Sequence, residues 1–322
     1  MAADNKPTIL KVGKFAMLPE LEQALKERGT YFVDSALSEE ERIKVRAQTD
    51  FVIASGGTRF QKEDYDSCPQ LKGIVCFSVG YDKIDVKEAI ARNVFLTHTP
   101  DVLSDEVANT ALMLLLTTTR QCKAAQDYIE EGVWGLAPAF PLTTSIGGKK
   151  LGIAGLGRIG KEIASRALSF KMEVGYYGRH PQADITYPYF SSLAELAKWS
   201  DVLLLAMPAT ADNKHCVNKE ILEQLGQQGY LINIARGSLV DTAALIAALD
   251  QGTIAGAGLD VFENEPQVPE ALWHRPNVIL QPHVGSATKE TRLAMANLVI
   301  TNLDAILHHE AVRTPVPGTR KQ

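Results

Sequence analysis

The chain has 322 residues, of which 45% are hydrophobic and 22% charged, a composition typical of a globular protein long enough for two domains. Its net charge of −5 argues against nucleic acid or an anionic membrane as the main partner. No apolar run reaches the roughly 20 residues that span a bilayer, and residues 1–7 lack the apolar core of a signal peptide. Four scattered cysteines without a CxxC pair predict neither a disulfide framework nor a metal site, so we expect a cytoplasmic protein.

The first hundred residues alternate short apolar, β-branched runs with helical patterns. Strands are predicted at 8–12, 51–54, 73–77 and 95–97, and helices at 18–28 and 86–92. This alternation predicts a parallel sheet with helices on both faces.

The pattern changes after residue 100. One long helix is predicted over 104–128, opening with a cap region that contains Asp101, Ser104 and Asp105. The glycine- and proline-rich segment 132–148 shows little periodicity and is predicted to form a long surface arm. The many apolar residues of the long helix, together with this arm, predict a homodimer with two-fold symmetry.

A second series of strands and helices begins at residue 151. Its strands are predicted at 151–154, 173–177, 201–206, 230–233, 254–259 and 278–280. The last long helix, 289–309, follows the series, so we expect it to return to the first domain. The first domain would then comprise 1–99 and 287–322, and the second would comprise 100–286. The predicted fold class is α/β, with two doubly wound parallel-sheet domains and a cleft between them.

A glycine-rich loop follows the strand predicted at 151–154 and opens an apolar-periodic helix at 159–170. Its residues are Gly155, Leu156, Gly157, Arg158, Ile159 and Gly160. In this context Gly155 permits a tight turn, Gly157 lets a pyrophosphate approach the backbone, and Gly160 lets helix and strand pack closely. Exposed N–H groups at the positive helix end attract phosphates. The loop therefore predicts a dinucleotide site, with a ligand-free glycine turn as the alternative.

The next strand ends in Tyr177, Gly178, Arg179 and His180. A site that prefers NAD carries Asp or Glu here, which accepts a hydrogen bond from the ribose 2′-hydroxyl. An arginine instead pairs with a 2′-phosphate through charge-assisted hydrogen bonds. We therefore predict NADPH as the preferred cofactor and NADH as a weaker one. Arg179, His180 and Lys161 form the expected cationic cage; a solvated surface arginine is the alternative.

Three further segments, 232–237, 258–266 and 281–286, each follow a predicted strand. In open α/β sheets, ligand-binding groups lie at the carboxyl ends of the strands. We therefore expect Arg236, Glu265 and His283, one from each segment, to converge on one crevice.

Together with the glycine loop, these segments resemble the D-isomer-specific 2-hydroxyacid dehydrogenase family, most of all its glyoxylate/hydroxypyruvate and hydroxyphenylpyruvate reductases. The resemblance covers nearly the whole chain, and the spacings from Arg236 to Glu265 and from Glu265 to His283 match the glyoxylate-reductase branch. It implies a Rossmann coenzyme domain inserted into a flavodoxin-like substrate-binding domain. It also implies NADPH-dependent reduction of glyoxylate or hydroxypyruvate to the D-2-hydroxy acid.

The resemblance also implies roles for individual residues. Arg236 is expected to bind the substrate carboxylate, which its planar guanidinium matches, and His283 to donate a proton to the carbonyl oxygen. Glu265 is expected to hydrogen-bond His283 and stabilise its charged form, with Glu263 as the competing candidate. Asp260 is expected to meet the nicotinamide carboxamide, with a helix or turn cap as its alternative.

Further contacts follow from the same resemblance. The Val79 and Gly80 amides are expected to bind the substrate carboxylate, Ser55 to form another wall, and Ser286 to contact the substrate. The remaining expected cofactor contacts are Thr110, Pro208, Ile234, Ala235 and Gly285.

The arm carries Trp134, which in relatives reaches across a dimer and limits the partner's pocket. Ala137 stands where glyoxylate reductases often have a second tryptophan. This departure leaves hydroxyphenylpyruvate or 2-ketogluconate open as substrates.

Two other classes of function are alternatives for a chain of this kind. One is a corepressor-like protein that senses NAD(P), which the intact Arg236, Glu265 and His283 argue against. The other is oxidation of formate or phosphite; formate enzymes normally carry Gln where this chain has Glu265.

Overall fold

The computed structural model describes residues 6–136 and 138–320. The chain divides into two compact units: the first runs to residue 103 and resumes at 287, and the second comprises 104–286. Among the described residues, no helix is long and apolar enough to cross a membrane. The same residues contain no group of three or more His, Cys, Asp or Glu side chains that could hold a metal ion.

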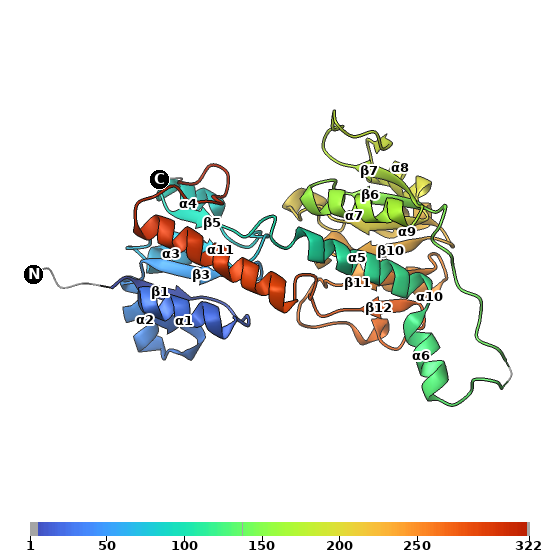
Figure 1. Ribbon diagram of the computed structural model, residues 1–322, viewed down its shortest axis with the longest axis horizontal. Helices are drawn as coiled ribbons and strands as arrows, with labels where there is room; N and C mark the ends of the chain where they lie inside the picture. Colours follow the sequence, from blue (N-terminus) through green and yellow to red (C-terminus); the bar gives the residue numbers. More distant parts are fainter. Residues whose placement is uncertain (1–5, 137, 321–322) are drawn as a thin grey trace, which may run out of the picture. The chain divides into compact units, whose positions relative to one another are not determined.

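The first unit is built on a five-stranded parallel sheet in the order β2-β1-β3-β4-β5 (Figure 1). Its strands are β1 (Thr8–Lys11), β2 (Thr30–Val33), β3 (Phe51–Ala54), β4 (Gly73–Cys76) and β5 (Phe95–Thr97). Its helices are α1 (Pro19–Arg28), α2 (Glu39–Ala47), α3 (Lys62–Ser67), α4 (Val86–Ala91) and α11 (Lys289–Leu307). Strands β3 and β4 are buried along their whole length, as expected for a parallel sheet covered on both faces.

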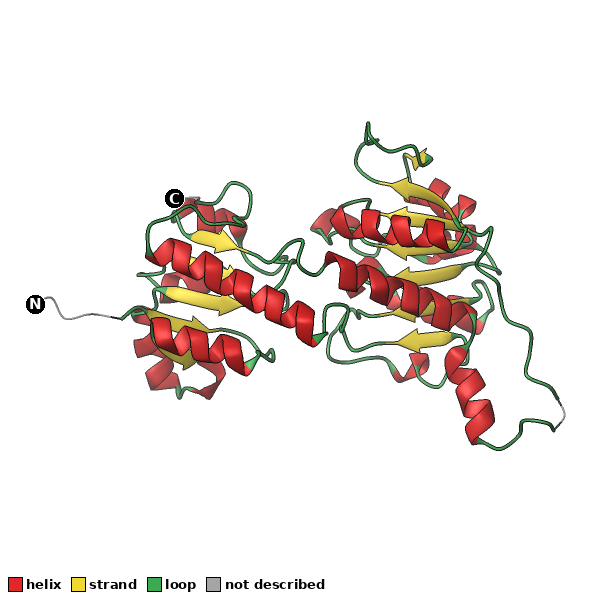
Figure 2. Cartoon of the chain, in the orientation of Figure 1, coloured by secondary structure: helices red, strands yellow, loops and turns green. Residues whose placement is uncertain are grey.

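This strand order places the carboxyl ends of β1, β3 and β4 along one edge of the sheet. The chain order reverses between β1 and β3, which is the flavodoxin-like switch point where such sheets bind ligands. Helices α1 and α11 lie side by side over the sheet (Figure 2).

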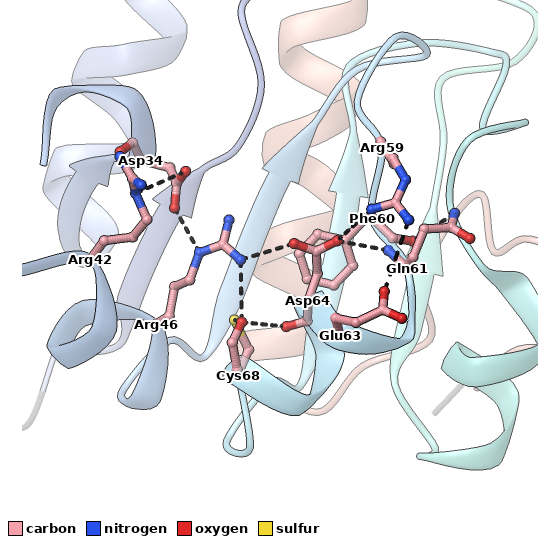
Figure 3. A network of polar contacts seen from close by, with 10 residues as sticks. Asp34, Arg42, Arg46, Arg59, Phe60, Gln61, Glu63, Asp64 and Cys68 are labelled. Atoms are coloured by element: carbon pink, nitrogen blue, oxygen red, sulfur yellow. Dashed lines mark hydrogen bonds and ion pairs between the residues drawn. The ribbon is translucent and has the colours of Figure 1, made fainter. Parts of the chain in front are cut away.

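An arginine network ties α2 and α3 together in this unit (Figure 3). Arg46 donates from Nε to Asp34 at 2.8 Å and from Nη1 to Asp64 at 2.9 Å. Burial lowers the pKa of Arg46, but the hydrogen bonds and charges of the two carboxylates outweigh it and raise the pKa above its ordinary value. The partly buried cation is therefore stabilised by its two carboxylate partners.

The second unit contains a seven-stranded parallel sheet in the order β12-β11-β10-β9-β6-β7-β8. Its strands are β6 (Lys150–Ala154), β7 (Glu173–Tyr177), β8 (Tyr189–Phe190), β9 (Val202–Leu205), β10 (Tyr230–Asn233), β11 (Gly256–Leu259) and β12 (Val278–Leu280). Its helices include α7 (Arg158–Ser169), α8 (Leu193–Trp199), α9 (Lys219–Leu225) and α10 (Thr242–Asp250). Counted from β6, the order is the Rossmann order extended by one edge strand. The predicted fold class is confirmed.

The single helix predicted over 104–128 is wrong. The structure has α5 (Ser104–Thr119) and α6 (Cys122–Glu130), separated at Gln121, whose φ of 47° is left-handed. The hydroxyl groups of Thr117 and Thr119 donate to backbone carbonyls four residues earlier, which weakens the helical ladder there. A left-handed residue then ends the helical repeat. The segment after α6 has no helix or strand among its described residues up to β6.

Candidate active site

A short loop after β12 carries His283 in a left-handed conformation, with φ of 55°. Such a conformation is costly for a non-glycine residue and persists only where the surroundings fix it. His283 N donates to the Asp260 carbonyl at 2.8 Å, and the Asp260 carboxylate accepts from Val284 N at 2.7 Å and Gly285 N at 2.9 Å. Thr110 donates to the Gly285 carbonyl at 3.3 Å. The end of β11 therefore holds the loop that presents His283.

Asp260 is almost completely buried, with 2% of its surface exposed. Burial raises the pKa of Asp260 above its ordinary value, although the two loop N–H groups and the nearby His283 oppose this shift. Because both carboxylate oxygens bind the loop, Asp260 acts as a turn cap in this structure. Its expected contact with the nicotinamide carboxamide stays a prediction.

Glu265 is hydrogen-bonded to His283, with 2.8 Å between Oε2 and Nδ1. Its other oxygen accepts from Phe262 N at 2.9 Å. Burial raises the pKa of Glu265, but the His283 hydrogen bond and charge, with smaller effects of Phe262 and Arg236, lower it overall. An ionised carboxylate accepts only, so Nδ1 carries the proton in this pair. Among the described residues, nothing hydrogen-bonds Nε2 of this half-exposed ring.

Glu263, the competing candidate, binds a different histidine. Its Oε1 lies 2.6 Å from Nε2 of His215, and its Oε2 accepts from the Thr242 hydroxyl at 3.0 Å. The geometry thus brings Glu265, and not Glu263, to His283.

Arg236 follows β10 on a turn that Asn233 fixes. The Asn233 side chain donates to the Arg236 carbonyl at 2.9 Å and accepts from Ala235 N at 3.0 Å. Sequence reasoning gave Asn233 no role, although its place at the end of a buried strand was the available signal. The Arg236 guanidinium donates from Nη1 to the Ala235 carbonyl at 2.7 Å.

Gly237 allows the segment carrying Glu265 to rest directly on the Arg236 turn. A Cβ added at Gly237 would lie 1.9 Å from the carbonyl carbon of Phe262, so no other residue fits there. This close approach explains why the charge of Arg236 contributes to the lowered pKa of Glu265. The three predicted residues Arg236, Glu265 and His283 therefore lie in one neighbourhood at the carboxyl edge of the second sheet.

The glycine loop after β6 has the shape of a phosphate site. Gly155 has φ of 101°, and a Cβ there would lie 2.7 Å from the Met207 backbone. A Cβ at Gly157, by contrast, would meet no heavy atom within 4 Å. Gly157 precedes the first residue of α7 and provides no side-chain cap, so no side chain at this position covers the first N–H groups of the helix. These residues fit the pyrophosphate of a dinucleotide.

The other predicted residues of the glycine loop differ in their exposure. The Leu156 side chain is buried, so only its backbone is accessible, whereas Arg158 is exposed and Ile159 is partly exposed. A Cβ at Gly160 would lie 2.3 Å from the Gly155 carbonyl oxygen, in keeping with the tight helix–strand packing expected there.

Exposed cationic side chains and the open space beside Gly178 lie at or near the end of β7. Arg179, His180 and Lys161 are all exposed, and within 6–136 and 138–320 no hydrogen bond or ion pair holds the Arg179 guanidinium. Beside it, a Cβ at Gly178 would have its nearest neighbour at 3.9 Å. The end of β7 therefore has both the room and the cations for a phosphate group.

The first unit presents its predicted substrate residues on two adjacent loops. Ser55 follows β3, Val79 and Gly80 lie beyond β4, and a Cβ at Gly56 would lie 3.1 Å from the Gly80 carbonyl. His98 donates from Nδ1 to the Val79 carbonyl at 2.9 Å and so fixes that peptide. Sequence reasoning missed His98, because its contact with the Val79 carbonyl is formed only on folding.

The other predicted residues occupy varied environments. Thr110, Ile234, Ala235 and Gly285 are buried, Ser286 is partly buried, and Pro208 is exposed. The Trp134 side chain on the arm is 78% exposed, and Ala137 lies outside the described residues.

Comparison with known proteins bears on this arrangement. Residues 112–285 match the family model described as "D-isomer specific 2-hydroxyacid dehydrogenase, NAD binding domain". Hydroxyphenylpyruvate reductase of Plectranthus scutellarioides is 43% identical over 82% of this chain and 84% of its own. The 2-ketogluconate reductase of Gluconobacter oxydans is 38% identical over 97% and 99%.

A solved structure is similar over nearly its full length. The NADPH-dependent glyoxylate/hydroxypyruvate reductase of Sinorhizobium meliloti, in complex with NADP and malonate, is 41% identical, with a TM-score of 0.90 and 98% of both chains covered. The expected resemblance is confirmed. The chain belongs to the D-isomer-specific 2-hydroxyacid dehydrogenase family of nicotinamide-dependent oxidoreductases.

Proposed function

We propose that this protein reduces a small 2-oxo acid, glyoxylate or hydroxypyruvate, to the D-2-hydroxy acid with NADPH as the preferred reductant. The observation that carries the proposal is the Glu265–His283 pair, 2.8 Å apart beside Arg236, in which Nε2 of His283 bonds no described residue. An imidazole fixed through Nδ1 and open at Nε2 is the arrangement that a proton donor requires.

The nicotinamide, when bound, supplies the hydride that adds to C2 of the oxo acid. Arg236 binds the C1 carboxylate through its planar guanidinium and polarises the 2-oxo group. As the C=O π bond breaks, Nε2 of His283 gives its proton to the oxygen and the ring becomes neutral. Glu265 accepts a hydrogen bond from Nδ1, which fixes the ring and leaves Nε2 as the nitrogen that donates the proton.

The second unit provides the proposed cofactor site. The backbone at Gly155–Gly160 takes the pyrophosphate, and Arg179, His180 and Lys161 surround a 2′-phosphate. Support comes from the open space at Gly157 and Gly178 and from the unpaired Arg179 described above. The Sinorhizobium relative, solved with NADP, favours the same cofactor here.

For the first unit, we propose that Ser55 and the Val79 and Gly80 amides contact the oxo acid. From the second unit, Ser286 joins the substrate contacts and Thr110, Pro208, Ile234, Ala235, Asp260 and Gly285 the cofactor contacts. Relatives named for hydroxyphenylpyruvate and 2-ketogluconate make these acids the alternative substrates.

The arm is proposed to dock on a second copy of the chain. Trp134, Leu136 and Leu142 are 78%, 63% and 100% exposed, an unusual concentration of apolar surface on one short segment. In Figure 1, α6 leads away from the second sheet toward this segment. Sedimentation velocity is expected to give a dimer for the wild type and a weakened one for Trp134→Ala; a monomeric wild type would refute this proposal.

The activity is tested by following NADPH oxidation with glyoxylate, hydroxypyruvate, hydroxyphenylpyruvate and 2-ketogluconate. We expect turnover with at least glyoxylate or hydroxypyruvate, and faster oxidation of NADPH than of NADH. Tight NADPH binding without reduction of any of the four acids would overturn the proposed reaction.

A further inference from the structure

Gln182, in the loop that joins β7 to β8, binds two separate parts of the second unit. Its side chain donates from Nε2 to the Leu156 carbonyl of the glycine loop at 2.8 Å, and its backbone N donates to the Tyr176 hydroxyl of β7 at 2.8 Å. Gln182 is partly buried, whereas Arg179 and His180 of the same loop are exposed. One residue therefore connects the loop of the proposed 2′-phosphate cations with the glycine loop.

Two tyrosines of the sheet hold the backbone of this loop, which comprises residues 178–188. It runs as bends and turns from the end of β7 to β8 (Figure 1). The Tyr189 hydroxyl donates to the Gly178 carbonyl at 3.1 Å, and Tyr176, which accepts from Gln182 N, is 1% exposed. A ring packed in the core is a rigid point of attachment. The backbone is therefore fixed to the sheet both before and after the exposed cations.

The hydrogen bond between Gln182 and Leu156 holds together the two loops that the proposed function gives to the cofactor. The glycine loop takes the pyrophosphate, and Arg179 takes the 2′-phosphate. Both groups are attached to one ribose, so their separation varies little and the loops must lie at a matching distance. A contact that is already made without the cofactor reduces the ordering that binding requires. NADH lacks the 2′-phosphate, so the distance between the loops matters less for NADH.

We propose that Gln182 is a positioning residue, which holds the Arg179 loop at the correct distance from the glycine loop and so contributes to selectivity for NADPH over NADH. The proposal rests on the proposed function for the identity of the cofactor, but not for the reaction with an oxo acid. Gln182 acts through the placement of Arg179 and need not touch the cofactor.

The kinetic test uses Gln182→Met, which keeps the length of the side chain and removes its N–H donors. We expect KM for NADPH to rise about 3- to 10-fold, the range for one hydrogen bond, with kcat and KM for NADH within about twofold of the wild type. Gln227→Met, at an exposed position of the same unit, is the matched control and should leave both KM values unchanged. Equal changes of KM for the two cofactors in Gln182→Met overturn the proposal.

Removal of Arg179 separates positioning from a general structural role. If Gln182 acts by placing Arg179, its substitution has little left to misplace in an Arg179→Ala background. We therefore expect Gln182→Met to change KM for NADPH less than about twofold in that background, a coupling that a double-mutant cycle measures. An undiminished effect of Gln182→Met in the absence of Arg179 would overturn the proposal.

A binding test is independent of turnover. Adenosine 2′,5′-bisphosphate and 5′-AMP share the adenosine and the 5′-phosphate and differ only in the 2′-phosphate. In calorimetric titration of the full chain, Gln182→Met should bind the bisphosphate about 3- to 10-fold more weakly than Gln227→Met, and 5′-AMP less than about twofold more weakly. If the wild type reduces no 2-oxo acid but the variants show this difference, the proposed reaction fails and the role of Gln182 stands. Equal changes for both nucleotides, or no preference of the wild type for the bisphosphate, overturn that role.

Discussion

Two glutamates of one short segment in the second unit, Glu263 and Glu265, each pair with a histidine. The two pairs differ in their surroundings. Glu265 pairs with His283, whose side chain is 51% exposed and whose Nε2 bonds no described residue. Glu263 pairs with His215 through Nε2 itself and also accepts from Thr242. Both histidines have left-handed backbones, so backbone strain does not separate them.

The difference lies in what each pair is connected to. His215 N donates to Ser238 O, so the Glu263 pair ties three loops together. The Glu265 pair instead stands next to Arg236 and presents one ring nitrogen to solvent. The same two residue types thus make a structural clamp in one place and a candidate proton donor in the other.

The largest expected effect separates the two histidines. His283→Gln removes the proposed donor and should lower kcat/KM for hydroxypyruvate about 10²- to 10⁴-fold, the usual contribution of general acid catalysis. His215→Gln should lower it less than about tenfold, because it touches no reacting group. Steady-state NADPH oxidation measures both, with NADPH binding by fluorescence as the control. Equal losses in the two variants would remove the distinction.

Substitution of the two glutamates should show the same contrast in activity as substitution of the two histidines. Glu265→Gln keeps a hydrogen-bonding group but loses the carboxylate that accepts from Nδ1 of His283 and fixes the ring, so we expect kcat to fall about 10- to 100-fold with KM nearly unchanged. Glu263→Gln should stay within about threefold of the wild type. Activity loss in Glu263→Gln alone would transfer the role to the competing residue.

A substitution at the proposed 2′-phosphate site should have a smaller effect, on KM for the cofactor. Arg179→Ala should raise KM for NADPH about tenfold and KM for NADH less than about threefold, since only NADPH carries the 2′-phosphate. Lys198→Ala, at an exposed position of α8, is the matched control for loss of charge. Initial rates with both cofactors measure the ratio; equal changes for NADPH and NADH contradict the cationic cage.

The smallest effect concerns stability and pH. Burial raises the pKa of Glu263, but hydrogen bonds from His215 and Thr242 and nearby positive charge lower it below the ordinary 4.5. A lowered folded-state pKa stabilises the protein above pH 4.5, and this stability is lost as pH falls through the lowered value. At pH 7, Glu263→Gln should therefore lower the free energy of unfolding by about 1 kcal/mol, which corresponds to a fall in Tm of a few degrees. The difference from the wild type should shrink below about pH 4.5; a difference independent of pH would contradict the assigned cause.

Much of the fold was readable because buried parallel strands are apolar throughout, as in β3, β4 and β9. Helix α2 was missed because none of its residues is buried, so it carries no apolar period. Strand β2 was missed for a related reason, since it is only partly buried at the sheet edge. The helix over 104–128 was predicted too long, because apolar periodicity does not register a left-handed break at Gln121.

The candidate site was predictable where strand ends carry unusual side chains, as at Arg236 and His283. The prediction that Glu265, not Glu263, reaches His283 agrees with the geometry, although its catalytic role stays a prediction. Asn233 was missed although its place at the end of a buried strand was a signal, whereas His98 was not predictable, since only the folded chain brings it near the Val79 carbonyl.

The most direct test of the central claim is the identity of the product formed from hydroxypyruvate and NADPH by the wild-type protein. Chiral chromatography should show D-glycerate accumulating in equal amount with the NADPH consumed. L-glycerate, or NADPH binding without any glycerate, would contradict the account.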